Sequence, residues 1–206
     1  GIPVVFLGSP QVWAWRKGRA KEISRLAAEV LCFYAFEPPI YRQQGGEARC
    51  IGHPLAQTIE PLSTRGKGLI LSPGSRLQEI QHVWPAMRKV AEVWQRIHPS
   101  SPIHLAQSPG LDLGLFGRLP ANTEVHTGLR PALEAGEVAL TCAGTASLET
   151  ACYGRPQVVV YRMGAFNSMV AGLLVPKTQK IALPNLLTKP YLRELRQSFS
   201  TEDLVV

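Results

Sequence analysis

The sequence predicts an α/β protein built from Rossmann-like parallel sheets with helices on both faces. Short apolar runs alternate along the 206 residues with longer segments whose apolar positions recur at helical spacing. In the second half the apolar runs follow one another at intervals of roughly 20 to 30 residues, which leaves room for a helix between consecutive parallel strands. A stretch rich in proline and glycine separates the two halves, so we expect two such sheets.

Residues 1–53 are expected to form the first domain, in the order strand, helix, strand, helix, strand. The opening run from Ile2 to Leu7 is apolar, follows no basic segment and carries no cleavage site. It therefore predicts a buried strand and a chain that begins within a fold. The predicted elements are a strand at 3–7, a helix at 11–28, a strand at 29–34, a helix at 37–44 and a short strand at 49–51.

Residues 54–67 are predicted to be a linker between two domains. The stretch contains Pro54, Pro61, Ser63 and Gly66, residue types that interrupt helices and strands. We therefore place a domain boundary here and assign residues 68–206 to the second domain.

The second domain is predicted to open with an apolar strand at 68–72, followed by a long amphipathic helix with apolar residues at helical spacing from Val83 to Ile97. Proline fits best in a first turn, so Pro85 predicts that this helix begins near that residue, after a short separate turn. Further strands are expected at 102–106, 123–126, 138–142, 157–161 and 180–183.

Charge and hydropathy narrow the classes of partner. No apolar run approaches the roughly 20 residues that a membrane-spanning helix needs. The formal net charge of +7 favours an anionic partner such as a nucleotide or a phospholipid surface, although a solvated basic surface explains it equally well. Lysine and arginine are scattered rather than gathered with aromatic residues in a stripe, which argues against nucleic acid.

The cysteines and histidines predict no metal or redox chemistry. The cysteines fall in no C-x-x-C spacing, so we expect reduced, structural thiols. No histidine pairs with a cysteine or a carboxylate at a familiar metal-ligand spacing, so no metal site is expected. His53 is either a polar cleft residue or, as we favour, a hydrogen-bonded structural group. The residues concerned are Cys32, Cys50, Cys142 and Cys152, and His53, His82, His98, His104 and His126.

The turn after the strand at 68–72 is a first candidate for ligand binding. Ligands of open α/β sheets bind at the carboxyl ends of strands, where helix N-termini suit phosphate. Gly74 permits close backbone approach, Ser75 can cap the helix or donate a hydrogen bond, and Arg76 can bind two phosphate oxygens. An ordinary strand-to-helix turn explains the same residues.

A second candidate follows the strand at 138–142, where the chain turns through Gly144 into a helix capped by Thr145 or Ser147. We expect Glu149 on the first turn of that helix, where its carboxylate could accept hydrogen bonds from the two hydroxyls of a ribose. The alternative, which these residues alone favour, is a capping-box acid that stabilises the helix N-terminus.

Two further features near the end of the chain could contribute. Leu183-Pro184-Asn185 predicts a strand end and a rigid turn, in which Asn185 either contacts a ligand or caps the next helix. Glu194 and Gln197 are expected on one face of a short helix, where they act together or are simply solvated.

Six short motifs, taken in order, resemble the lipid-A-disaccharide synthases, and the resemblance runs from residue 3 to about 197. Each motif alone is weak, but their common order and spacing are specific. The motifs are Ser9-Pro10-x-Val12-Trp13-Ala14-Trp15-Arg16, Ile51-Gly52-His53-Pro54, Pro73-Gly74-Ser75-Arg76-x-x-Glu79-Ile80, Gly144-Thr145-Ala146-x-Leu148-Glu149, Tyr161-Arg162-Met163 and Leu183-Pro184-Asn185-Leu186-Leu187.

The resemblance implies a GT-B fold, with 1–53 as the rest of an acceptor-side domain and 68–206 as the nucleotide-sugar domain. It implies an inverting transfer without metal or cofactor, from UDP-2,3-diacylglucosamine to 2,3-diacylglucosamine 1-phosphate, with a β-1,6 link and release of UDP. Arg76 and Asn185 would be active-site residues. The other donor-binding positions would be Gly74, Ser75, Gly144, Thr145, Glu149 and Gln197.

The family places a general base and a glycine-rich acceptor loop in an earlier part of the N-terminal domain, and closing helices beyond Val206. We expect both to be missing here, so the fragment alone is expected to bind UDP without turnover. The resemblance also implies a cytoplasmic protein at the inner face of the membrane, and leaves the oligomeric state open. An amphipathic segment at 166–177 is suited to anionic lipid or acyl chains, or equally to packing on the sheet.

Two alternatives remain. The chain could be a non-catalytic UDP-sugar-binding remnant, recognisable by binding without turnover even when the missing part is restored. It could instead be another GT-B enzyme such as a UDP-N-acetylglucosamine 2-epimerase, which would need catalytic carboxylates and a histidine in motifs that we do not find in this sequence.

Overall fold

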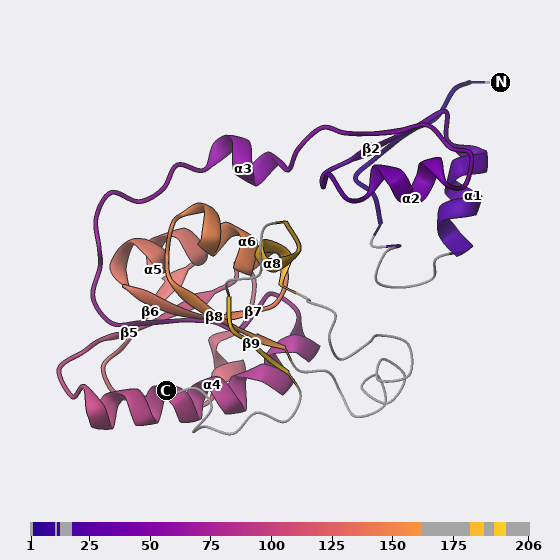
Figure 1. Cartoon of the computed structure of the whole chain (residues 1–206). Coiled ribbons are helices and arrows are strands. Elements are labelled where there is room, and N and C mark those ends of the chain that lie inside the picture. The colour runs from indigo at the N-terminus through magenta and orange to yellow at the C-terminus, as the bar shows by residue number, and fades with distance from the viewer. Residues whose placement is uncertain (1, 11, 13–17, 162–181, 188–191, 197–206) are drawn as a thin grey trace. The chain divides into compact units, whose positions relative to one another are not determined.

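The computed structural model describes residues 2–10, 12, 18–161, 182–187 and 192–196 of the chain (Figure 1). It divides into two compact units, one formed mainly by Gly1–Ile59 and the other beginning at Glu60. In both units every described strand pairing is parallel, as the alternation of apolar runs and helical segments predicts.

The first unit contains a three-stranded sheet with the strand order β1-β2-β3. Its core is small and joins the sheet to the first two helices, with Val30, Cys32 and Tyr41 among its buried residues. The strands are β1 (Val5–Leu7), β2 (Glu29–Cys32) and β3 (Ala48–Cys50), and the helices are α1 (Gly18–Leu26), α2 (Pro38–Arg42) and α3 (Pro54–Thr58). The short helix α3 occupies part of the stretch predicted as a linker.

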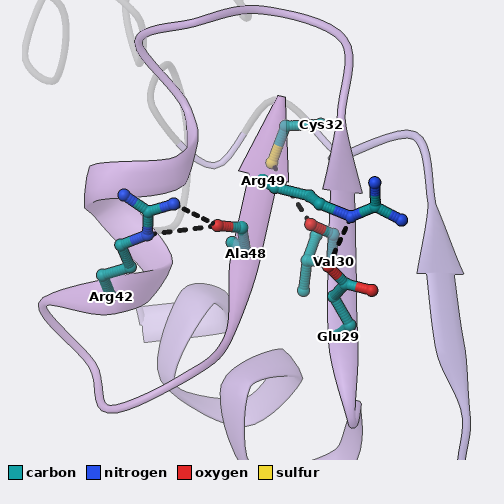
Figure 2. A network of polar contacts seen from close by, with 6 residues as sticks. All are labelled: Glu29, Val30, Cys32, Arg42, Ala48 and Arg49. Carbon is teal, nitrogen blue, oxygen red and sulfur yellow. Dashed lines mark hydrogen bonds and ion pairs between the residues drawn. The ribbon is translucent and has the colours of Figure 1, made fainter. Parts of the chain in front are cut away.

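An arginine ties α2 to β3, as Figure 2 shows. Arg42 donates two hydrogen bonds to the Ala48 carbonyl oxygen, from Nε at 3.1 Å and from Nη2 at 2.7 Å. On β3, Arg49 Nε pairs with Glu29 Oε1 of β2 at 2.7 Å. The second pair is solvated, so we assign it little stability, whereas the first satisfies a backbone carbonyl next to the core.

The prediction that the opening run is a buried strand is wrong. The side chains of β1 are exposed, from 38% for Phe6 to 65% for Leu7. Among the described strands it pairs only with β2 and lies at the edge of its sheet, so apolar sequence alone did not reveal its exposure.

The second unit contains a six-stranded parallel sheet with the strand order β6-β5-β4-β7-β8-β9. The chain enters at β4, adds β5 and β6 on one side, and then returns to add β7 on the other. The order therefore reverses between β4 and β7, which is where doubly wound sheets bind ligands. The strands are β4 (Leu69–Ser72), β5 (Ile103–Gln107), β6 (Thr123–Thr127), β7 (Val138–Cys142), β8 (Gln157–Tyr161) and β9 (Glu194–Arg196).

Helices cover both faces of this sheet, with α4 on one face and α5 and α6 on the other (Figure 1). The main core lies under α4, where Val83 and Met87 pack with strand residues such as Leu71 and Leu105. Trp84 donates from Nε1 to the Phe116 carbonyl oxygen at 2.9 Å, which anchors the connection after β5. The helices are α4 (Leu77–Ile97), α5 (Leu129–Ala135), α6 (Thr145–Cys152) and α8 (Leu183–Leu187), with a 3-10 turn η1 (Leu113–Phe116).

Pro85 lies inside α4 rather than near its start, so the prediction of a helix boundary there is wrong. An interior proline removes one backbone hydrogen bond and costs about 3 kcal/mol. Buried residues on both sides of it, Val83 and Trp84 before and Met87 after, share one apolar stripe. Continued burial of this stripe outweighs the cost of the proline.

Two predictions near the end of the chain are also wrong. Leu183 opens the helix α8, so it is not the end of a strand; residues 180 and 181 lie outside the described part. Glu194 lies in β9 instead of a helix, and β9 pairs with β8 in the register Val159↔Glu194. β9 pairs with the edge of β8 that β7 leaves open, and this distant partner cannot be predicted from the local sequence pattern.

Candidate functional site

The turn between β4 and α4 is the point where three strand ends meet. Gly74 has φ +104°, and a Cβ there would lie 3.6 Å from Cys142 Sγ at the end of β7 and 3.0 Å from Glu79 Oε2. Ser108, just beyond β5, donates from Oγ to the Gly74 carbonyl oxygen at 3.2 Å. Gly74 therefore lies at the switch point of the sheet, and close approach of a ligand to its backbone stays a prediction.

Arg76 occupies the N-cap position of α4 and makes no capping hydrogen bond with its side chain. The cap is thus not Ser75, which is exposed. Arg76 Nη1 lies 2.9 Å from Glu79 Oε1, and 81% of the Arg76 side chain is exposed. Such a solvated pair is weak, so an anion at the helix N-terminus can replace Glu79 as the partner of Arg76.

The second corner joins β7 to α6. Gly144 is the N-cap of α6 with φ +139°, and the space that a Cβ would occupy there is open to 4 Å. The predicted capping by Thr145 or Ser147 is wrong, because Thr145 opens the helix and Ser147 is buried within it. A glycine with positive φ and no neighbouring atoms at its Cβ position leaves the backbone N–H groups at a helix N-terminus accessible to an anion.

Glu149 lies in the second turn of α6, not in the first as predicted. A capping-box acid must stand at the third helical position, so that alternative does not apply to Glu149. The side chain is partly buried, and burial raises the pKa of its carboxyl group. Its suggested contact with ribose hydroxyls stays a prediction.

A buried polar chain fixes the second corner, and sequence reasoning missed it. Thr141 donates from Oγ1 to Gln157 Oε1 at 2.7 Å, and Gln157 donates from Nε2 to the Ser147 carbonyl oxygen at 2.8 Å. Ser147 in turn donates from Oγ to the Gly144 carbonyl oxygen at 2.7 Å. The one available signal was Gln157 itself, a polar residue opening an apolar strand.

Asn185 is buried in α8, which packs against α6. Its Nδ2 donates to the Leu192 carbonyl oxygen at 2.9 Å and to Glu194 Oε1 at 2.7 Å. Its Oδ1 accepts from the Leu192 backbone N–H at 2.9 Å. Asn185 thus joins α8 to the start of β9; it lies within the helix, so neither the turn nor the cap predicted for it is observed.

His53, in the first unit, takes the structural role that the sequence favoured. Its Nδ1 accepts a hydrogen bond from the Leu55 backbone N–H at 3.2 Å and so caps α3. The ring also stacks on Tyr34, with 5.6 Å between centroids. Burial lowers the pKa of His53, which keeps Nδ1 free of a proton for the cap.

The structure brings the Gly74 corner to the end of β7, two residues before Gly144. Several predicted contributors lie outside the described residues: Trp13, Trp15, Arg16, Arg162, Met163, Gln197 and the segment 166–177. Among the residues that are described, none belongs to a helix long and apolar enough to cross a membrane.

A doubly wound parallel sheet with two glycine corners at its switch point defines a Rossmann-like α/β protein, the kind of domain found in GT-B glycosyltransferases. A model of one family, described as Lipid-A-disaccharide synthetase, matches residues 2–204. The chain belongs to this family.

Individual relatives agree with the family assignment. A lipid-A-disaccharide synthase from Anaeromyxobacter dehalogenans (strain 2CP-C) is 35% identical over 204 residues, which cover 91% of this chain and 53% of the relative. Those from Koribacter versatilis (strain Ellin345) and Myxococcus xanthus (strain DK1622) are 33% and 31% identical, and each match covers 100% of this chain and 58% of the relative. The chain thus spans little more than half the length of these relatives.

Proposed function

We propose that this chain is the nucleotide-sugar side of a lipid-A-disaccharide synthase. The reaction is an inverting, metal-independent transfer of 2,3-diacylglucosamine from its UDP donor to 2,3-diacylglucosamine 1-phosphate, with a β-1,6 link and release of UDP. The observation that carries the proposal is the junction at Gly74, where three strand ends meet beside the N-terminus of α4 in a member of this family.

The chemistry of the leaving group explains why the junction suits the reaction. As the bond to the sugar breaks, negative charge grows on the departing diphosphate, and an enzyme without a metal must stabilise it with fixed dipoles and cations. In our proposal Arg76 turns from Glu79 to the diphosphate, while the first N–H groups of α4 and α6 face its oxygens. Gly74 and Ser75 line the first corner, and Gly144 and Thr145 the second.

Glu149 and Asn185 take supporting roles in this proposal. Glu149 accepts hydrogen bonds from the ribose hydroxyls, one turn beyond the phosphate corner. Asn185 lies at the active site and acts through its bonds to Leu192 and Glu194, which hold the segment leading to β9 and Gln197 beside the donor.

Other steps of the reaction need residues from the part of the family's sequence that this chain does not cover. Deprotonation of the acceptor hydroxyl requires a general base, and we place it in that part. The acylated acceptor also requires access to a membrane, so we propose that the protein is cytoplasmic and peripheral at the inner face of the cytoplasmic membrane. The net charge of +7 supports contact with anionic lipid.

Replacing Arg76 by alanine should lower kcat for disaccharide formation about 100-fold, because one charge-stabilising donor is lost from the transition state. The assay follows the disaccharide by mass spectrometry and uses a protein in which this chain is joined to the part of a family member that it does not cover. Arg88→Ala is the matched control, since Arg88 also pairs with a glutamate on α4, at 3.0 Å from Glu92. A protein that binds UDP but forms no disaccharide would refute the proposed enzyme.

A further inference from the structure

Two histidines and a glutamate gather on the face of the second unit's sheet that is opposite to α4. Their ligand atoms all lie within 4.8 Å of one another. His104 belongs to β5, and Glu124 and His126 belong to the neighbouring strand β6, in the register His104↔Glu124 (Figure 1). The spacing of these residues along the chain did not predict the group, which forms only when β5 and β6 pair.

The three ligand atoms are close enough to bind one metal ion. His104 Nδ1 lies 3.0 Å from His126 Nε2 and 3.5 Å from Glu124 Oε2, and His126 Nε2 lies 3.8 Å from the same oxygen. The point in their plane that is equidistant from the three atoms lies about 2.0 Å from each, which is the bond length of zinc to imidazole nitrogen or carboxylate oxygen. Tetrahedral coordination, with the ion displaced from this plane toward a fourth ligand, requires only a small shift of the three side chains.

A backbone carbonyl orients the ring of His104, the buried member of the group. His104 Nε2 lies 2.9 Å from the Lys67 carbonyl oxygen, which can only accept, so Nε2 carries the proton and the Nδ1 lone pair faces the other two residues. Histidine ligands of metals almost always donate their second ring N–H in this way. A Cβ at Gly136 would overlap Ile70 and lie 3.2 Å from His104 Cδ2, so glycine leaves room there for both side chains.

The three side chains differ in their exposure to solvent. The His104 side chain is 4% exposed and forms the floor, His126 is 19% exposed, and Glu124 is 61% exposed at the rim. An ion can therefore enter past Glu124, and water can complete its coordination. Three protein ligands and one water is a coordination that zinc adopts readily.

The geometry points to a zinc-binding site formed by His104, Glu124 and His126, which links the edge strand β6 to β5. Imidazole ligands favour zinc over magnesium or calcium, which prefer oxygen. On binding, the His126 proton that bridges to His104 Nδ1 moves to the other ring nitrogen, and both lone pairs turn to the ion. His104 and Glu124 stand near the amino ends of their strands, whereas the proposed UDP site lies at the carboxyl ends. The ion thus stabilises the sheet edge and takes no part in transfer.

Titration of zinc into the metal-free chain by calorimetry should show saturable binding of one equivalent. Zinc should raise the unfolding temperature, because only the folded chain assembles the site. Magnesium should not raise it, because magnesium prefers oxygen ligands. Glu124→Ala and His126→Ala should each weaken binding at least tenfold. His82→Ala, a histidine on α4 outside the group, should leave it unchanged.

Cobalt(II) supplies an independent reading of the ligands. Nitrogen and oxygen ligands give weak visible bands, whereas thiolate ligands add a strong band in the near ultraviolet. Failure of the folded chain to bind zinc, or equal affinity in Glu124→Ala, would overturn the site; circular dichroism establishes that this exposed-residue variant is folded. A thiolate band would overturn it too, because the metal would then be held by cysteine.

Discussion

Replacing Gly68 by alanine should destabilise the second unit by about 4 kcal/mol or more, near the upper end for a single substitution. Gly68 has φ +91°, and a Cβ there would overlap the Pro102 carbonyl oxygen. That oxygen also accepts a hydrogen bond from the Leu69 backbone N–H at 3.1 Å, a contact between the starts of β4 and β5. The carbonyl cannot move away without breaking this contact. Urea unfolding followed by circular dichroism measures the loss.

Gly110→Ala is the control that separates backbone strain from overlap of the added Cβ with a neighbouring atom. Gly110 has a similar φ of +81° but nothing within 4 Å of the added Cβ, so it should lose only the backbone strain, about 1–2 kcal/mol. If the two variants lost equal stability, the close approach of Gly68 to Pro102 would not be what requires glycine there.

Gln157→Leu should destabilise the chain by about 2–4 kcal/mol and also weaken UDP binding. The substitution keeps the volume but leaves the buried Thr141 hydroxyl without its acceptor, at about 1–3 kcal/mol. It also removes one hydrogen bond to the Ser147 carbonyl oxygen, at about 0.5–1.5 kcal/mol. Loss of this support lets the turn at Gly144 shift, so its N–H groups no longer point at the phosphate. Unfolding and calorimetric titration on the same samples measure both effects.

Thr150→Val is the matched control for Gln157→Leu. Thr150 is also buried and polar, but its hydroxyl bonds only to the Ala146 carbonyl oxygen within α6, at 2.8 Å. We expect a loss of about 0.5–1.5 kcal/mol and unchanged UDP affinity. Equal effects on UDP affinity would mean that the Gln157 chain does not position the corner.

Much of the strand pattern was predictable because apolar runs and glycine turns are local signals. The strands at 138–142 and 157–161 were predicted with the bounds observed. The edge position of β1, the continuation of α4 through Pro85 and the strand at Glu194 all depend on partners distant in sequence. Local periodicity carries no information about those partners.

The candidate site divides in the same way. Gly74 and Gly144 were predictable, since a strand that turns into a helix needs glycine where the backbone φ is positive. The chain through Gln157 was not, because it joins residues 10 and 16 positions apart that meet only after β7 and β8 have paired. The pairing of His104 with His126 likewise follows from the register of β5 and β6.

Calorimetric titration of UDP into the 206-residue chain tests most directly whether the Gly74 and Gly144 corners bind a diphosphate. We predict saturable binding that Arg76→Ala weakens about tenfold or more at low salt, and that Arg88→Ala leaves unchanged. Added salt should weaken the wild-type interaction and narrow the difference between Arg76→Ala and wild type, since the contact is ionic. A folded chain that binds no UDP, or equal weakening by the two arginine variants, would contradict the nucleotide site.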